Sequence, residues 1–430
     1  MAFNTFKSHW QVQYHLPRNA LAMAYYFIRL IIVIGGVGII LLINNSFQQA
    51  DIFSVDRNVA TTIIDKHDNL TLTSSDSKEV EQISRVFPIW IENRLANNNN
   101  SRPYDWCVPE DIATNNNNES QKGLLFVKVH KCSSSTGAGV TLRIRDGLSK
   151  RLMHVSVKHC FAHYDHAEAR ELGFQKRDRS ESFLWSIVRE PAQRTLSHFF
   201  YFQVSRNNVT ATEESILSAL KGRLTTKFLR HNFQSSYLDL PNQHVKSRVD
   251  RIINGYDFLA VSERLDESLV VLAMLAQVPL SDMVVFSSKV SGGYSFARKK
   301  HEGCVKVAKK WTTPKIDEYI QGSYRSDNAD DYLLYNAAQR SLDKTIESLG
   351  RKRVEENVKL LKNLQQQNQD QCASEVVMPC PQPAGELEKL EHERRYNESC
   401  YASDFGCGHA CTDRALADYT EKEWANLMSG

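Results

Sequence analysis

The stretch GLLFVKVHKCSSSTGAGVTLRI, residues 123–144, decides the fold that the chain is expected to adopt. Its apolar run ends in His130 and Lys131, and three serines, a threonine and two glycines follow. Farther on, Val140 and Ile144 recur at the spacing of one helix face. A buried strand that turns into a helix through a run of hydroxyl side chains is therefore expected here.

This strand-to-helix turn has the features of an anion site. The first N–H groups of a helix have no backbone partner, and the helix dipole makes that end positive. Lys131 adds a full charge, and Gly137 and Gly139 indicate that something approaches the helix backbone closely. A Walker A loop places its lysine after its glycines, so this is not a loop of that type. A serine-rich helix cap without a ligand is the alternative interpretation.

Two more apolar runs indicate buried strands, FLWSIV at 183–188 and YDFLAV at 256–261. Helical patterns follow all three runs, which favours an α/β fold with helices on both faces of a parallel sheet. The second run ends before Arg189, and a serine lies eight residues after it. Because ligands bind beyond the carboxyl ends of parallel strands, Lys131 and Arg189 suit a ligand with two separate anionic groups. An ion pair with Glu190 is the alternative role for the arginine.

The composition excludes a basic field over the whole protein, since the net charge of the 430 residues is 53 − 50 = +3. Nucleic acid is therefore not an expected partner. Residues 20–43, ALAMAYYFIRLIIVIGGVGIILLI, carry one charge, Arg29, and are long enough for a transmembrane helix. Basic residues precede this run and acidic residues follow it, which places the N-terminus in the cytosol and the bulk in the lumen. A cleaved signal peptide is the alternative, although no small-residue cleavage site follows the run.

The rest of the chain divides by composition. Residues 44–122 are polar and contain NNNN twice, as partly disordered stems do. Five of the nine cysteines fall in the last 60 residues, where disulfides are expected, with a zinc site as the alternative. The odd number leaves at least one thiol free or intermolecular. Residues 351–371 are expected to form an exposed helix. The expected order is a cytoplasmic tail, a signal anchor, a lumenal stem, a catalytic domain and a helical, cysteine-rich extension, at 1–19, 20–43, 44–122, 123–350 and 351–430.

These motifs resemble those of the Golgi carbohydrate sulfotransferases. FVKVHKCSSSTGAG resembles their 5′-phosphosulfate loop, and IVREPAQRTLSHFFYF resembles their 3′-phosphate motif, with its arginine and serine eight residues apart. Residues 256–286 and 330–350 are similar to segments of the galactose 3-O-sulfotransferases, and the segment between the phosphate motifs is similar to that of the heparan 2-O-sulfotransferases. The resemblance spans roughly 124–350. Glu190 departs from it, because aspartate is usual there, and so do the two helix glycines.

The resemblance implies an α/β, three-layer, P-loop-like sulfotransferase fold around a central parallel sheet, preceded by a single transmembrane helix. It implies transfer of a sulfuryl group from 3′-phosphoadenosine 5′-phosphosulfate (PAPS) to a glycan hydroxyl, with galactose on a glycolipid or glycoprotein as the expected acceptor. Lys131 would stabilise the charge on the leaving oxygen, and no metal would be required. The residues implied to bind PAPS are Lys131, Ser133, Ser134, Ser135 and Thr136 at the 5′-phosphosulfate and Arg189 and Ser197 at the 3′-phosphate.

The acceptor hydroxyl needs a general base, and histidine suits this role because its pKa is near neutrality. In the resembling enzymes a histidine between the two phosphate motifs lies by the acceptor. This favours His159 or His163, with His130 as the alternative base. These imidazoles could instead be solvated, or bind a metal together with His166, although no acidic third ligand is evident.

Arg230, Asn232 and Gln234 follow the 3′-phosphate helix and are expected to contact the sugar, with ordinary surface polarity as the alternative. The basic, glycine-rich residues 287–303 suit a loop that closes over the nucleotide, or a solvated loop. The expected location is the Golgi membrane, as a single-pass type II protein with a lumenal catalytic domain, and homodimerisation is left open. A membrane-tethered glycan-binding protein and a nucleotide-dependent kinase on the same fold are the alternative functions.

Overall fold

The computed structural model describes residues 88–90, 106–109, 121–152, 160–224, 226–241, 245, 247–286, 291–296, 304–376 and 408–429. They belong to one compact unit, Lys78–Gly430. The expected tail, the expected signal anchor and most of the expected stem lie outside the described residues, as do His159 and most of 287–303. None of the described helices has the length and apolarity that crossing a membrane requires.

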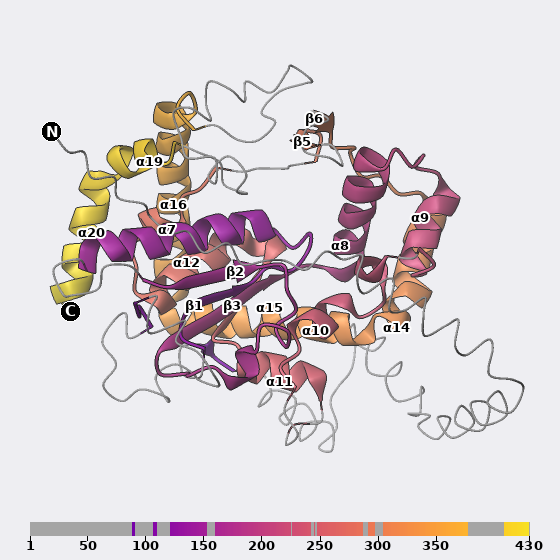
Figure 1. Ribbon diagram of the computed structural model, residues 1–430, viewed down its shortest axis with the longest axis horizontal. Helices are drawn as coiled ribbons and strands as arrows, with labels where there is room; N and C mark the ends of the chain where they lie inside the picture. Colours follow the sequence, from indigo (N-terminus) through magenta and orange to yellow (C-terminus); the bar gives the residue numbers. More distant parts are fainter. Residues whose placement is uncertain are drawn as a thin grey trace, which may run out of the picture. The chain divides into compact units, whose positions relative to one another are not determined.

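A four-stranded parallel sheet lies at the centre of this unit, as the alternation of apolar runs predicts (Figure 1). Its order is β2-β1-β3-β4, formed by β1 (Gly123–Val127), β2 (Ala162–Asp165), β3 (Ser182–Val188) and β4 (Phe258–Val261). Leu125 of β1 is in register with His163 of β2 and Leu184 of β3. Three of these strands are expected from the sequence, whereas β2 reads AHYD and lacks an apolar run.

Helices cover the sheet because its central strands are apolar on both faces. Every residue of β1, β3 and β4 is buried. Helix α7 (Ser134–Leu152) packs on β1, β2 and β3, while α12 (Leu265–Ala276) and α15 (Ala329–Leu349) pack on β4 (Figure 1). The predicted α/β architecture with a central parallel sheet is thus confirmed.

Shorter elements surround these layers. Pro191 lies in the first turn of the helix that follows β3, where its missing N–H leaves no helical bond unmade. The shorter elements are η2 (Phe174–Lys176), α8 (Pro191–His198), the π-helix η3 (Phe199–Arg206), α9 (Glu213–Leu220), η4 (Lys227–Leu229), α10 (Phe233–Leu238), α11 (Arg248–Gly255), η5 (Ser262–Arg264), η6 (Leu280–Met283), the antiparallel pair β5 (Tyr294–Phe296) and β6 (Cys304–Lys306), α13 (Pro314–Tyr319), η8 (Ile320–Tyr324) and α14 (Arg325–Asp327).

The start of α7 lies directly on β1. A Cβ atom at Gly137 would lie 2.3 Å from Cζ of Phe126, so only glycine lets the helix come this close. Phe126 is buried, and its ring packs on Trp185 of β3 with 4.4 Å between the ring centroids. At Gly137, therefore, the close approach that the glycines indicate comes from the sheet itself.

Helix α16 (Arg351–Cys372) is part of the core. Val354, Leu361 and Leu364 are at most 4% exposed and belong to the same hydrophobic cluster as the sheet. Their face of the helix packs on α12. The expectation of an exposed helix at 351–371 is therefore wrong for this face, because a few apolar residues at helical spacing suffice to bury it among many charged ones.

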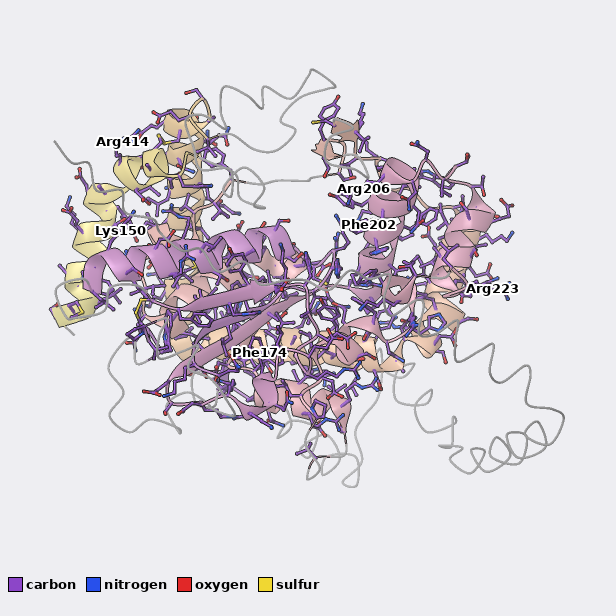
Figure 2. The ribbon with its side chains drawn as sticks, viewed as in Figure 1. Lys150, Phe174, Phe202, Arg206, Arg223 and Arg414 are labelled. Atoms are coloured by element: carbon purple, nitrogen blue, oxygen red, sulfur yellow. A yellow bond between two sulfur atoms is a disulfide. The ribbon has the colours of Figure 1, made fainter. Side chains whose placement is uncertain are left out.

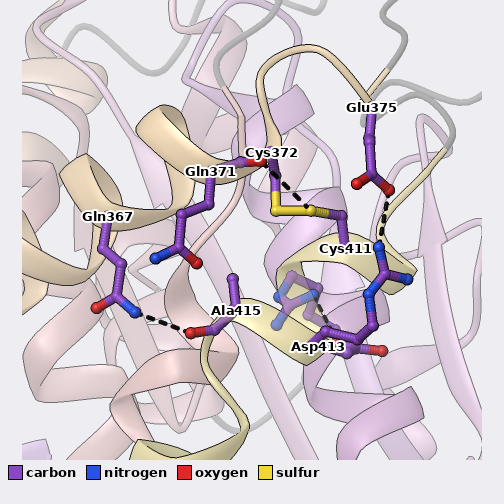
Figure 3. The surroundings of a disulfide bond; sticks show 9 residues. Gln367, Gln371, Cys372, Glu375, Cys411, Asp413 and Ala415 are labelled. Atoms are coloured by element: carbon purple, nitrogen blue, oxygen red, sulfur yellow. Dashed lines mark hydrogen bonds and ion pairs between the residues drawn. A yellow bond between two sulfur atoms is a disulfide. The ribbon is translucent and has the colours of Figure 1, made fainter.

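A disulfide attaches the C-terminal helices α19 (Ala410–Ala415) and α20 (Ala417–Ser429) to α16. It links Cys372 to Cys411, and beside it Gln367 donates a hydrogen bond to the Ala415 carbonyl (Figure 3). The prediction of disulfides in the tail is thus confirmed. A second disulfide, Cys107–Cys160, ties 106–109 to the residues before β2.

The C-terminal helices also hold the second half of α7. Asp413 of α19 forms ion pairs with Arg143 and Lys150, the latter labelled in Figure 2. At the end of α7, the guanidinium of Arg151 lies 4.7 Å from the ring centroid of Trp424 in α20. The tail therefore contacts the end of α7 that lies away from the turn after β1.

We expect Gly137→Ala to lower the free energy of unfolding by about 1–3 kcal/mol, because the added methyl group overpacks Phe126. Gly322→Ala is the matched control, since Gly322 is a helical residue at which an added Cβ would have no neighbouring atom within 4 Å. That substitution should leave stability unchanged or raise it. Denaturant unfolding of both variants checks this, and equal stabilities would contradict the close contact.

Candidate functional site

The turn after β1 has an uncommon backbone. Lys131 and Ser133 have positive φ angles of 65° and 51°, which residues other than glycine rarely adopt. Such residues concentrate at functional sites, where surrounding contacts hold them in place. Turns of this kind can direct successive N–H groups into one concavity that suits an anion.

Helix α7 begins at the end of this turn. Ser133 is its N-cap, since its carbonyl accepts a hydrogen bond from the N–H of Gly137 at 3.1 Å. The N–H groups of Ser134, Ser135 and Thr136 precede that first helical bond and have no partner within the helix. The dipole of this 19-residue helix favours negative charge at the same place. The predicted phosphosulfate residues therefore share one helix terminus.

Arg189 follows β3, the strand next to β1, and contacts the turn. Its Nη1 donates a hydrogen bond to the Lys131 carbonyl at 3.1 Å. Its Nε lies 3.7 Å from Oε1 of Glu263, which follows β4. Glu190 instead caps α8, accepting a hydrogen bond from the N–H of Gln193 at 2.6 Å. The structure thus brings the two predicted cationic strand ends together, and the acidic partner of Arg189 is Glu263 rather than Glu190.

The ammonium of Lys131 lies over an aromatic ring. Its Nζ is 3.7 Å from the ring centroid of Tyr201 in η3, a distance typical of a cation–π contact. The Tyr201 hydroxyl is hydrogen-bonded to the hydroxyl of Ser295 in β5 at 2.5 Å, and both residues are buried. Sequence reasoning missed Tyr201 because only the structure places η3 beside the turn.

Lys310 is a further cation beside Arg189. Burial lowers the pKa of Lys310, and the positive charge of Arg189 lowers it further. Its ammonium donates a hydrogen bond to Oε1 of Gln193 at 2.8 Å. The lysines and arginine of the basic segment, at 298–300, lie outside the described residues. A short basic segment before Trp311 was the only sequence signal for Lys310.

His130 is enclosed by aromatic rings. It stacks on His166 with 4.0 Å between centroids and lies 4.3 Å from the ring of Phe228. Burial, followed by the charge of His166, lowers the pKa of His130 to about 2. The pKa of His198 is also lowered to about 2, by burial and then by Arg194. Both imidazoles are therefore neutral at neutral pH and are weak proton acceptors.

His166 follows directly after β2 and is exposed. Its Nδ1 lies 2.7 Å from the Lys128 carbonyl, which can only accept, so Nδ1 carries the proton and Nε2 is the basic atom. The expected base His163 lies within β2 against Phe174, and burial lowers its pKa. Among the described histidines beside the Lys131 turn, His166 is thus the accessible one.

The other predicted contacts lie in different environments. Ser197 is half-buried in the last turn of α8, and Arg230 is exposed at the end of η4. Asn232 uses its side chain within the fold, since Oδ1 accepts a hydrogen bond from the N–H of Asp331 at 3.1 Å. Gln234 is 1% exposed, and its amide contacts the turn after β1 and the end of β3. Of the three expected sugar contacts, Arg230 is the exposed one.

Within the described parts of the chain, no group of three or more histidine, cysteine or acidic side chains could hold a metal ion. No protein-family model, curated protein or solved structure matches this chain. The resemblance to sulfotransferases therefore rests on the short motifs around Lys131 and Arg189 and on residues 256–286 and 330–350, of which the last segment is the looser match.

We expect the Cys132 thiol to resist alkylation at pH 8, because it is fully buried and burial raises its pKa to about 12. Peptide mapping by mass spectrometry after iodoacetamide treatment should find Cys132 modified only in unfolding concentrations of guanidinium. Rapid labelling of Cys132 in the folded protein would show that the turn after β1 opens to solvent.

Proposed function

We propose that the chain is a PAPS-dependent carbohydrate sulfotransferase with the three-layer, P-loop-like fold of that class. The contact between the Arg189 guanidinium and the Lys131 carbonyl is the observation that carries the proposal. It joins two cationic strand ends on neighbouring strands, as a nucleotide with anionic groups at both its 5′ and 3′ positions requires. A ligand with a single phosphate would use only one of them.

In this proposal the 5′-phosphosulfate binds at the N-terminus of α7, on the N–H groups and hydroxyls of Ser133–Thr136. The 3′-phosphate binds at Arg189, with Ser197 and the neighbouring Lys310 as further donors. Lys131 leaves the Tyr201 ring and contacts the oxygen that bridges phosphorus and sulfur. A phosphosulfate competes well for this ammonium because a full anion attracts it more strongly than a ring face does.

The reaction is an in-line displacement at sulfur. The acceptor hydroxyl oxygen forms a bond to sulfur while the bond from sulfur to the bridging oxygen breaks, and adenosine 3′,5′-bisphosphate leaves. Lys131 stabilises the negative charge that develops on the leaving oxygen. The hydroxyl proton passes to a general base, and we assign that role to Nε2 of His166 because its Nδ1 proton is held by Lys128. The chemistry requires no metal.

The acceptor and the location belong to the same proposal. The acceptor is a glycan hydroxyl, with galactose on a glycolipid or glycoprotein as the proposed sugar, and the Golgi membrane is the proposed site. The apolar run at 20–43 supports a type II membrane anchor. The glycan-binding alternative differs in one measurable way, since such a protein would bind glycans but would not be retained on immobilised adenosine 3′,5′-bisphosphate.

We expect Lys131→Ala to lower kcat for transfer from labelled PAPS to a galactose-terminated glycan by about 100-fold or more. Its unfolding temperature should change little, because Lys131 is only partly buried and its cation–π contact with Tyr201 contributes at most about 1 kcal/mol. Lys150→Ala is the matched control. Lys150 lies in the last turn of α7, away from the turn that holds Lys131, and forms an ion pair with Asp413, so this variant should keep full activity. Undiminished turnover of Lys131→Ala would remove Lys131 from the mechanism.

We expect His166→Ala to lower kcat by about 100-fold while the affinity for adenosine 3′,5′-bisphosphate changes less than about threefold. His130→Phe should retain most activity, because phenylalanine keeps the ring packing on Phe228 and His166. Steady-state kinetics and calorimetry measure the two effects. If His130→Phe lowered kcat more than His166→Ala does, the general base would be His130.

A further inference from the structure

The side-chain amide of Gln234 lies between the two cationic strand ends. Its Oε1 accepts a hydrogen bond from the N–H of Arg189 at 2.9 Å and another from the Cys132 thiol at 3.2 Å. Its Nε2 donates to the Arg189 carbonyl at 2.8 Å. One buried amide therefore bonds both the residue after β3 and the residue beside Lys131.

The backbone of Gln234 is itself held firmly. The N–H groups of Gln234 and Ser235 donate to the two carboxylate oxygens of Asp331, at 3.0 and 2.7 Å. Asp331 lies in α15 and is 2% exposed, and its own N–H donates to Oδ1 of Asn232. Because these bonds are reciprocal and buried, α10 presents the Gln234 amide from a fixed position on α15.

The direct bond between the two strand ends cannot hold them together in the same way when ligand is bound. The guanidinium of Arg189 donates to the Lys131 carbonyl, but the proposed 3′-phosphate competes for that guanidinium. The Gln234 bonds use the backbone of Arg189 and the thiol of Cys132, neither of which the proposal assigns to the ligand. They can therefore persist in the complex.

We infer that Gln234 is a positioning residue that fixes the spacing between the two anion-binding ends, so that one nucleotide engages both of them at once. This inference rests on the proposed function. A fixed spacing makes the second phosphate contact effectively intramolecular once the first has formed. Loops that moved independently would have to be ordered on binding, which lowers the affinity for a ligand that needs both anion-binding ends. A ligand with one phosphate does not depend on the spacing.

Three nucleotides test this by calorimetry on the full chain in detergent: adenosine 3′,5′-bisphosphate, adenosine 5′-monophosphate and adenosine 3′-monophosphate. Gln234→Met keeps the side-chain length and removes the hydrogen bonds to both strand ends. We expect its affinity for the bisphosphate to fall about tenfold, which corresponds to about 1.4 kcal/mol. Its affinity for each monophosphate should fall less than about threefold. An equal loss for all three nucleotides would overturn the inference, since it would indicate general structural damage.

Cys132→Ala provides a milder variant, because it removes one of the three hydrogen bonds of the Gln234 amide and leaves both bonds to Arg189. It also removes the longer contact of the thiol with the His130 carbonyl, which does not involve Gln234. It should show the same selective loss for the bisphosphate, reduced to about threefold. It decides the question if Gln234→Met does not fold, and unchanged bisphosphate affinity in Cys132→Ala would then overturn the inference. Gln366→Met, on the exposed face of α16, is the control and should bind all three nucleotides as the unaltered chain does.

The unaltered chain separates this inference from the proposed function. If it binds the bisphosphate more tightly than either monophosphate, the two-anion site stands and the variants report on Gln234 alone. If it binds none of the three nucleotides, the proposed function fails and the inference fails with it.

Discussion

The contact between Gly137 and Phe126 is the constraint on which the site depends. A helix that follows a strand after a short turn must pack back over the sheet within a few residues, and here it does so with its first turn against the Phe126 ring. The absence of a side chain at Gly137 sets the depth of that contact. As a result the first N–H groups of α7 emerge at the end of β1, beside the end of β3, where Arg189 lies. A bulkier residue would lift the helix and separate the two.

Helix α7 is held at both ends by parts of the chain that are distant in sequence. The turn before it contacts Arg189, which follows β3, and Ser262, which follows β4. Its second half forms ion pairs with Asp413 in the C-terminal helices. The proposed phosphosulfate site is thus the terminus of an element that the whole domain positions, which is how a rigid scaffold supports chemistry on a short loop.

The central strands could be predicted from sequence because burial on both faces demands continuous apolar runs. The edge strand β2 could not, since AHYD is half-buried and its strand character comes from pairing with β1. Lys131 and Arg189 could be selected as candidate anion-binding residues because each follows the end of such a run. The position of Gln234 depends on a contact across 102 residues, and that of His130 on the rings that enclose it. Neither contact leaves a local pattern, so the motifs suggested a sugar contact for Gln234 and an alternative general base for His130.

The disulfide between Cys372 and Cys411 has a consequence for the order in which the molecule matures. All four strands and α7 have been synthesised long before Cys411 emerges, whereas Cys107 and Cys160 are both available while β3 and β4 are still to be made. The Cys372–Cys411 disulfide, which attaches the C-terminal helices, can therefore form only later than the Cys107–Cys160 disulfide. A chain that has folded its sheet but has not yet been oxidised at Cys372 would carry the proposed anion-binding turn on a helix whose opposite end is not yet secured. Oxidation at Cys372 and Cys411 would then secure that end of α7 after the sheet has formed.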